Sequence, residues 1–459
     1  GLIEQGEKSK EAALSVHRLR RLQAGALFRT RQLEQSQRLY GALLAPRGLR
    51  LRRGYWRALL TLGWLQTLML LWAAVPERWM RRPSSLWQRE RMALMHDITD
   101  SVGWMWLSVG LEYNMRSTLL ARRLTDPADR LHAQVTRAVV VGFSGNALDG
   151  VLRRSHRMLD GADETARRHR IPLGLEFTGR WRAALFMQHD PLKAYDAAAA
   201  SVMGHRRQGA MARNDAIWAL GWQLLACETL CRHDEALEIC KKMETYQTAW
   251  AEAFAFAPRL RILARLGRFE RSDELHRRWT QALPSELTAE HFWVTLSMGM
   301  VDVARGRFES VLEEMNRLYE PIRGAGTFLL NFNLSYWMMP YLDAAVGLAR
   351  AGKLSAARSR RIERAASRVQ RLGIVSHRSM GARAIALMSH HRGDARRARR
   401  HLGQALALSE AVQAPYHRWC CVRAALEMGV EAERFEAEAK ALAEAHGFVL
   451  PRDEPAAPQ

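Results

Sequence analysis

The chain of 459 residues has little cysteine, little proline and almost no lysine. Its five cysteines are too few for the disulfide framework of a short secreted domain, so we expect a reducing, cytoplasmic compartment. Proline occurs only 14 times, and alternating runs of β-branched residues are nearly absent. Long runs of Ala, Leu, Arg and Glu at helical spacing therefore predict an all-α fold.

The sequence also lacks the short motifs of common enzymes. It contains no H-E-x-x-H, G-x-S-x-G or G-x-G-x-x-G sequence. A cluster of Cys227, Cys231, His233 and Cys240 lacks the tight paired spacing of a structural zinc site, so buried free thiols are the better interpretation. We expect no catalytic residues, no metal and no cofactor.

The stretch GLARAGKLSAA, residues 347–357, differs from a phosphate-binding P-loop at one position. Gly347, Gly352 and Lys353 fit G-x-x-x-x-G-K-[ST], but Leu354 stands where the magnesium-binding hydroxyl belongs. A P-loop follows a strand, whereas the residues before Gly352 have a helical pattern. We therefore interpret Gly352 and Lys353 as a turn between two helices.

Positive charge is in excess, with 69 Lys and Arg against 47 Asp and Glu, a net charge of +22. Such an excess predicts salt-sensitive attraction to nucleic acid, anionic lipid or an acidic protein surface. The arginine runs at 358–371 and 392–400 wrap round their helices and match no DNA-binding motif. Solvated helix faces are the simplest interpretation, and an acidic protein partner is the alternative.

The longest uncharged run is ALLTLGWLQTLMLLWAAV, residues 58–75, with arginines on both sides. Its 18 residues just reach the length of a transmembrane helix. However, Gln66 lies at its centre, and basic residues on both flanks give no orientation signal. We expect a buried connecting helix, with a membrane span or an interfacial helix as the alternatives.

Six short fragments share a turn of small or polar residues followed by a helix with an early small residue. They are QHDPLKA (188–194), CRHDEAL (231–237), LGRFERS (266–272), RGRFESV (305–311), AGKLSAA (351–357) and RGDARRA (392–398). Their starts advance by 35 to 46 residues. This scatter is too loose for identical repeats, but it suits tetratricopeptide-like units, whose basic length is about 34 residues, with lengthened helices. The small residues expected at the closest helix contacts are Ala194, Ala236, Ser272, Ser310, Ala356 and Ala398. This pattern predicts a tetratricopeptide-like α-solenoid of stacked antiparallel helix pairs.

The segments LLACETLCRHDEALEICKKM, RILARLGRFERSDELHRRW and ALMSHHRGDARRARRHLGQALALSEAV resemble the C-terminal tetratricopeptide region of large bacterial signalling ATPases of the STAND or AAA type. The last segment, with Gly393, Ala398, Leu402 and Ala405 followed by Pro415, is the most similar. In that group the repeats follow an ATPase that is often fused to a Ser/Thr kinase or nucleotide cyclase. The resemblance implies a regulatory protein-interaction module without catalytic residues. Its partner is expected to be protein, either upstream catalytic domains of the same polypeptide or a separate acidic partner.

We predict an N-terminal helical hairpin (1–50), apolar and basic connecting helices (51–95), a tetratricopeptide-like array (96–430), a C-terminal capping helix (431–450) and a disordered tail (451–459). The first helices of stacked pairs line the inner curve of such an array. Polar residues at otherwise apolar positions of these helices are the expected partner-binding residues: Asn214, Arg259, Asn333 and Arg378. The alternative functions are a small-ligand sensor with one pocket lined by Trp and Arg, a nucleic-acid binder, and a membrane adaptor that uses residues 58–75.

Overall fold

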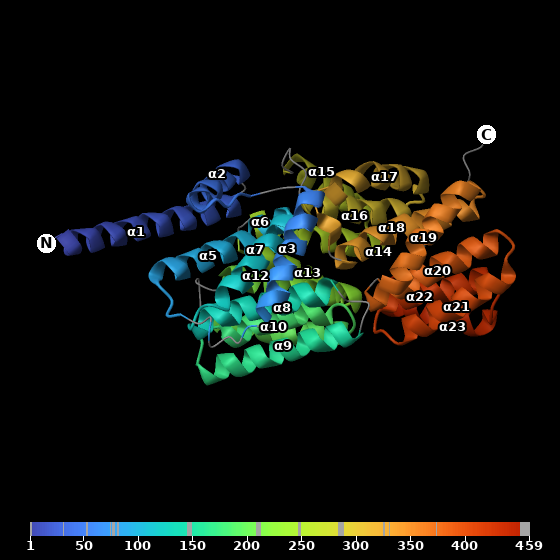
Figure 1. The fold of residues 1–459 in the computed structure, drawn as a ribbon. Helices are drawn as coiled ribbons and strands as arrows, with labels where there is room; N and C mark the ends of the chain where they lie inside the picture. Colours follow the sequence, from blue (N-terminus) through green and yellow to red (C-terminus); the bar gives the residue numbers. More distant parts are fainter. Residues whose placement is uncertain are drawn as a thin grey trace.

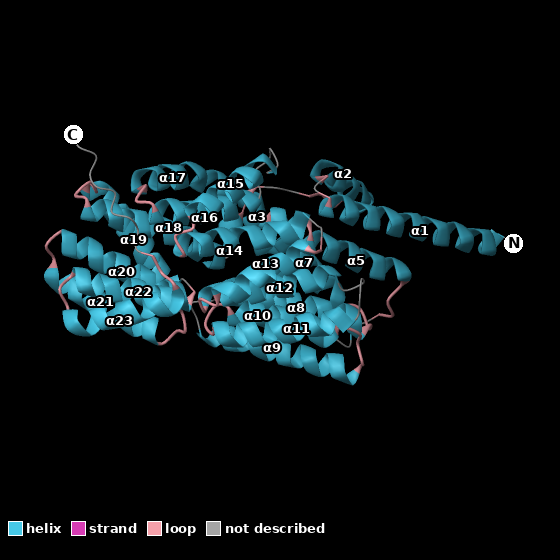
Figure 2. Cartoon of the chain, turned by 180° about the vertical axis from the view of Figure 1, so that it is seen from behind, coloured by secondary structure: helices cyan, strands magenta, loops and turns pink. Residues whose placement is uncertain are grey.

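The computed structural model describes residues 2–30, 32–51, 54–73, 75, 79, 82–144, 149–207, 213–246, 249–282, 289–324, 326–329, 331–372 and 374–449. Figure 2 shows helices and loops throughout these residues, without strands, and their one extended pairing is an isolated bridge between Arg82 and Leu124. The predicted all-α fold is confirmed. The tail predicted for 451–459 lies outside the described residues.

The N-terminal part begins with a long helix that extends away from the body of the molecule (Figure 1). This helix, α1, packs against α2 and α5. Arg21 of α1 forms ion pairs with two carboxylates of α5: Glu90, at 3.2 Å, and Asp97, at 2.5 Å. The elements here are α1 (Leu2–Arg29), α2 (Leu33–Leu44), η1 (Ala45–Arg47), α3 (Tyr55–Ala73), α5 (Leu86–Asp100), α6 (Val102–Met105) and α7 (Leu107–Ala121).

From α8 onward the helices form two rows. Each even-numbered helix from α10 to α22 contacts the next even-numbered one, and each odd-numbered helix from α11 to α23 packs on its even-numbered neighbours. The elements are α8 (Pro127–Ser144), α9 (Asp149–Arg168), α10 (Gly174–Phe186), α11 (Pro191–Arg207), α12 (Arg213–Thr229), α13 (His233–Glu244), α14 (Ala249–Arg265), α15 (Phe269–Ala282), α16 (Ala289–Ala304), α17 (Phe308–Gly324), η3 (Thr327–Leu329), α18 (Asn331–Arg350), α19 (Ala356–Leu372), α20 (Val375–His391), α21 (Ala395–Glu410), α22 (Pro415–Glu427) and α23 (Ala432–His446).

The difference between the two rows follows from the distribution of apolar residues. In the even row, α20 is buried almost all round, from Ser376 to Ser389. In the odd row, α19 buries Ile362, Ala366 and Val369 at spacings of three and four residues and exposes arginines on the opposite face. A helix with one apolar stripe covers a core, whereas a helix that is apolar all round must lie inside it.

The turns between the helices confirm the interpretation of the glycine joints. Gly267, Gly306, Gly352 and Gly393 have φ between +65° and +81°, the left-handed region in which glycine is unstrained. At the 347–357 stretch, the Lys353 amide donates to the Leu348 carbonyl at 2.9 Å and closes the end of α18. Because a helix, α18, precedes this turn, Gly352 and Lys353 do not have the strand context of a P-loop.

The register predicted for the small contact residues is correct in four helices and wrong in two. Every odd-numbered helix from α11 to α21 buries its fourth residue: Ala194, Ala236, Ser272, Val311, Ser359 and Ala398. Ser310 and Ala356 are instead exposed. Ser310 is only the third residue of α17, which begins at Phe308, so Val311 takes the buried fourth position. Ala356 is the first residue of α19, so Ser359 takes that position there.

The prediction of a buried helix at 58–75 is wrong, because α3, which covers most of this run, is half-exposed. One face of α3 packs Leu65 and Met69 against α7, while Leu60 and Trp64 on the other face are 77% and 62% exposed. A search of the described helices for one both long and apolar enough to cross a membrane finds none.

The even row curls round until distant parts of the chain meet. Helix α6 contacts α16, helix α8 contacts α18, and α7 contacts η3. At this closure, the rings of Phe143 and Phe332 lie 5.1 Å apart, edge to face, and the Val375 amide donates to the Gln188 carbonyl at 2.9 Å. The even-numbered helices from α8 to α18 therefore surround a common space.

Candidate functional site

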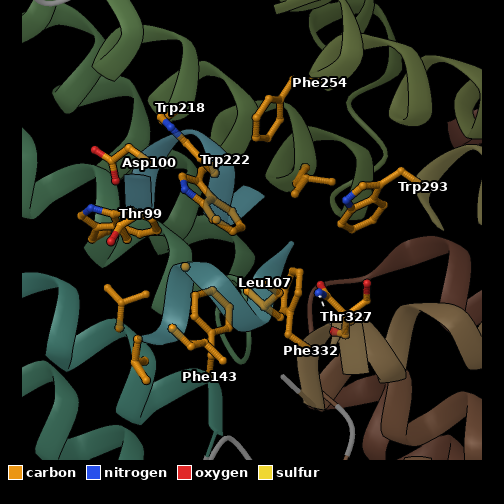
Figure 3. Close-up of a pocket in the computed structure, with 18 of the residues that line it drawn as sticks. Thr99, Asp100, Leu107, Phe143, Trp218, Trp222, Phe254, Trp293, Thr327 and Phe332 are labelled. Atoms are coloured by element: carbon orange, nitrogen blue, oxygen red, sulfur yellow. Dashed lines mark hydrogen bonds between the residues drawn. The ribbon is translucent and has the colours of Figure 1, made fainter. Parts of the chain in front are cut away.

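A cavity of about 160 Å³ lies between the inner helices, with walls from α5, α6, α7, α8, α10, α12, α14, α16, η3 and α18. Figure 3 shows aromatic side chains converging on it from several helices. Its aromatic lining comprises Trp181, Trp218, Trp222, Trp293, Phe143, Phe254 and Phe332. Most ligand pockets are apolar and aromatic with a few polar groups, and this composition matches them.

The aromatic wall is built from helical spacing and ring contacts. Trp218 and Trp222 are four residues apart on α12, so both point from the same helix face. Trp218 contacts Trp181 at 5.6 Å and Phe254 at 4.9 Å between ring centroids. Gly221 gives Phe254 its space, because a Cβ there would lie 2.8 Å from the phenyl ring.

The opposite wall depends on two glycines that bring α6 and α7 together. A Cβ on Gly103 would lie 2.5 Å from the Cα of Gly110, so neither position accepts a side chain without a backbone shift. Both glycines line the cavity. This tight contact folds α6 back on α7 and leaves the space between them and the aromatic wall open.

A buried ion-pair network forms another part of the wall. The Arg261 guanidinium donates from Nε and Nη2 to the two carboxylate oxygens of Glu228, at 2.7 and 2.6 Å, and from Nη1 to Ser297 at 3.1 Å. Arg265 lies 3.1 Å from the same carboxylate. Burial by itself raises the pKa of Glu228, but the two arginines outweigh it and hold this pKa below its usual value. The network joins α12, α14 and α16.

A second charged group lies at the end of the cavity formed by α5. Asp100, the last residue of α5, lines the cavity, and its carboxylate lies 4.0 Å from Nη2 of the buried Arg180. Arg180 donates to Asp215 from Nη1. Burial raises the pKa of Asp100 to about 7, despite the opposing effect of Arg180.

Neutral imidazoles lie beside this charged group. His96 and His132 are stacked with ring centroids 3.4 Å apart, and His132 stacks in turn on Phe177. Burial lowers the pKa of His96 to about 3 and holds the pKa of His132 well below its usual value. Both rings are therefore uncharged near neutral pH.

Two indole donors at the cavity have no acceptor. The Nε1 atoms of Trp181 and Trp222 are buried and meet no hydrogen-bond partner among the described residues. Buried donors of this kind are normally satisfied. Together with Asp100, they give the cavity polar groups at a largely aromatic surface, an arrangement suited to binding.

The three predicted partner-binding residues whose side chains are described do not converge. Asn333 lines the cavity and donates to the Thr327 carbonyl at 3.0 Å. Arg259 forms an ion pair with Glu244, with 2.5 Å between nitrogen and oxygen, and does not line the cavity. Arg378 lies half-buried on α20, also outside the cavity. Asn214 lies in α12, but its side chain is outside the described part of the chain.

Sequence reasoning did not single out the residues that line the cavity, and only some of them had a recognisable signal. The four-residue spacing of Trp218 and Trp222 indicates only that they share a helix face, although a pocket lined by Trp and Arg is among the alternatives that the sequence leaves open. Asp100 had no distinguishing pattern, because its role depends on Arg180, 80 positions further along the chain. The cysteines are buried free thiols, and burial raises the pKa of Cys227 to about 12. In the described part of the chain, no group of three or more metal-ligating side chains is found.

Comparison with known proteins identifies no family for this chain, so the proposed function depends on the geometry of the cavity. A scan against protein-family models finds no match, and a search of curated proteins finds no significant match either.

Proposed function

We propose that the protein is a non-catalytic, tetratricopeptide-like α-solenoid that binds a small, mainly apolar ligand and regulates a partner protein. The observation that supports this function is the aromatic cavity, which is lined by residues from Thr99 to Asn333. A cavity of about 160 Å³ has the size class that accepts a single aromatic ring. This proposal combines the sensor alternative with the regulatory role that the resemblance implies.

The regulatory step follows from the position of the cavity at the closure of the even row. Its walls come both from α6–α8 and from α16–α18, the two parts that meet there. A ligand in the cavity contacts both parts and favours the closed arrangement over any more open one. The difference in affinity between the two arrangements sets the size of the response.

The resemblance to the repeat region of signalling ATPases suggests the partner. In such an arrangement, closure of the array would restrain or release an ATPase or kinase domain, either on the same polypeptide or on a separate acidic protein. The exposed arginines of α19 and α21 supply a basic surface for an acidic partner. Nucleic acid remains an alternative ligand for the same surface, and steep salt dependence of binding would identify it.

Benzyl alcohol tests the proposal as a neutral probe of one ring. At about 0.6 kcal/mol per heavy atom, its eight heavy atoms give a Kd on the order of 0.3 mM. We expect a rise in Tm that saturates with probe concentration. Trp222→Ala should weaken the effect at least tenfold. Trp419→Ala is the matched control, because Trp419 is equally buried but lies outside the cavity.

Two results would contradict the proposal. One is an unchanged Tm over millimolar benzyl alcohol, which would mean that the cavity admits no ring. The other is equal loss of the response in Trp222→Ala and Trp419→Ala, which would mean that the probe acts on stability elsewhere.

A further inference from the structure

The charges at the α5 end of the cavity do not balance. Arg180 is fully buried and faces two carboxylates, hydrogen-bonded to Asp215 and 4.0 Å from Asp100. A charge-assisted hydrogen bond between a guanidinium and a carboxylate is normally 2.7–2.9 Å long. The Asp100 carboxylate therefore has no direct hydrogen bond to Arg180. With both carboxylates ionised, this group of three side chains carries one negative charge in excess.

The Asp100 carboxylate is also accessible from the cavity. Its side chain is 31% exposed, and it lines the cavity next to the tryptophans. In the view of Figure 3, Asp100 lies toward the same end as Trp218, while Thr327 lies toward the other. The contacts agree, since Arg180 neighbours Asp100 and lies 5.0 Å from the ring of Trp181, which contacts Trp218.

Two further features favour a cation at this position. Asp100 ends α5, so the negative end of the helix dipole lies beside its carboxylate. Tryptophan rings attract cations through their π electrons, and the Arg180 guanidinium over the ring of Trp181 is an example at this end of the cavity. The cationic end of Arg261 does not offer a competing anion site, since all three of its nitrogens already donate to Glu228 or Ser297.

We propose that the ligand of this cavity is an organic ammonium compound, with its cation at Asp100 and its apolar body among the tryptophans. The inference rests on the proposed ligand-binding function and names the class of ligand. The volume of about 160 Å³ limits the body to about one ring, since a cavity of about 150 Å³ binds benzene. Benzylammonium fits this description.

Three probes of the same shape separate charge from size: benzylammonium, benzyl alcohol and benzoate. Isothermal titration of the unmodified chain should give a Kd for benzylammonium at least tenfold lower than for benzyl alcohol, with benzoate the weakest. This comparison needs no variant. Equal affinities for the ammonium and the alcohol would overturn the ammonium proposal and leave the proposed ligand-binding function intact. Binding of none of the probes would overturn both.

Asp100→Asn assigns the effect to the carboxylate. The variant should lose the tenfold preference for benzylammonium and keep its affinity for benzyl alcohol. Asp196→Asn is the matched control, because it removes an exposed carboxylate on α11 that lines no part of the cavity. If the preference survives in Asp100→Asn, or is lost equally in Asp196→Asn, the cation does not lie at Asp100.

The exposed face of α3 supports a second, independent inference. Leu60, Trp64, Leu70 and Leu71 are each at least 60% exposed. Arg57 is also exposed, and it lies three residues before Leu60 and seven before Trp64, on the same side of the helix. The surrounding sequence, residues 35–89, contains ten arginines and a single acidic residue, Glu77.

We propose that α3 docks in the plane of an anionic lipid bilayer. Leu60 and Trp64 enter the boundary between headgroups and acyl chains, as in interfacial amphipathic helices, and Arg57 contacts lipid phosphate. The charge of this region favours anionic lipid over an apolar protein surface, because each basic residue near an anionic membrane adds attraction.

Vesicle co-sedimentation tests the docking surface. The chain should bind vesicles containing phosphatidylserine at least tenfold more tightly than vesicles of phosphatidylcholine alone, and salt should weaken the binding. The double variant Leu60→Glu/Trp64→Glu should lose at least tenfold. Leu19→Glu/Met203→Glu makes the same charge change at exposed apolar residues of α1 and α11, and should bind normally.

Two results would overturn the docking proposal. The first is failure to bind phosphatidylserine vesicles. The second is a dimer in solution that dissociates in Leu60→Glu/Trp64→Glu, which would show that a second copy of the chain covers α3.

Discussion

The buried Glu228 carboxylate offers the sharpest test of how the inner helices are held together. Glu228→Gln keeps the size of the side chain but removes a negative charge that lies within 3.1 Å of both Arg261 and Arg265. All three side chains are buried, so water cannot replace the lost partner. Removing one member of a buried ion pair costs about 3–5 kcal/mol, because a buried charge is left uncompensated.

The expected change in melting temperature follows from the size of the chain. At about 2.1 cal/mol/K per residue, a chain of 459 residues has an unfolding entropy of about 1 kcal/mol/K. A loss of about 3–5 kcal/mol then lowers Tm by about 3–5 °C if the array unfolds as one unit. Differential scanning calorimetry measures this shift directly.

An exposed pair of the same chemistry is the control. Arg317 donates from two nitrogens to both oxygens of Glu314 at 2.8 and 2.7 Å, but the two side chains are 68% and 46% exposed. Exposed pairs contribute less than about 1 kcal/mol. Glu314→Gln should therefore leave Tm almost unchanged. Equal shifts in Glu228→Gln and Glu314→Gln would refute the argument from burial.

The pH dependence supplies a second check on Glu228. Its pKa in the folded protein is lowered, so the folded state favours the carboxylate form. The stability that Glu228 contributes is present above the unfolded pKa of about 4.3 and is lost as pH falls through the folded pKa. The difference in stability between the unmodified chain and Glu228→Gln should be largest near pH 7 and shrink in acid.

Three further predictions concern other parts of the chain. Ala398→Trp overfills the fully buried contact between α20 and α21, so residues 405–421 should lose hydrogen-exchange protection while 220–312 keep it; uniform loss would indicate a single cooperative globule. Lys353→Ala should change neither Tm nor ATP titrations, since this lysine lies in a turn after α18; ATP binding lost in the variant would restore the P-loop interpretation. Asp100 has a raised pKa of about 7, so the folded state favours its protonated form, and the free energy of unfolding falls as pH rises from about 4 to 7. At pH 8, Asp100→Asn should therefore be more stable than the unmodified chain, by about 1–2 kcal/mol given the partial exposure of Asp100. At pH 4 the two should be equally stable.

The sequence by itself determined the helices and most of the turns between them. These features depend on residues only a few positions apart: spacings of three and four place apolar side chains on one face, and Gly393 at φ +81° ends α20 in a conformation that most other residues avoid. Ala398 could be placed at a buried contact for the same reason, since it lies three residues after Ala395, where α21 begins.

The exact start of a helix was less accessible to sequence reasoning. Ala356 was predicted at a contact and is exposed, because α19 begins later after its turn than α15 or α17 do. An offset of one residue rotates a helical side chain by about 100°, and an offset of three residues moves it almost one turn, about 4.5 Å, along the helix axis. The pattern of small residues indicated where helices follow turns, and packing decided which residue of each helix is buried.

Only the tertiary structure decided which side chains meet in the cavity. Asp100, Trp218 and Asn333 line the same space although they are separated by more than a hundred residues each. Their meeting depends on contacts between helices far apart in the chain, such as those between α8 and α18 and between α6 and α16. The same long-range packing buries one face of α3 and exposes Trp64 on the other. Local spacing defines the faces of each helix, but the accumulated geometry of many contacts determines what each face touches.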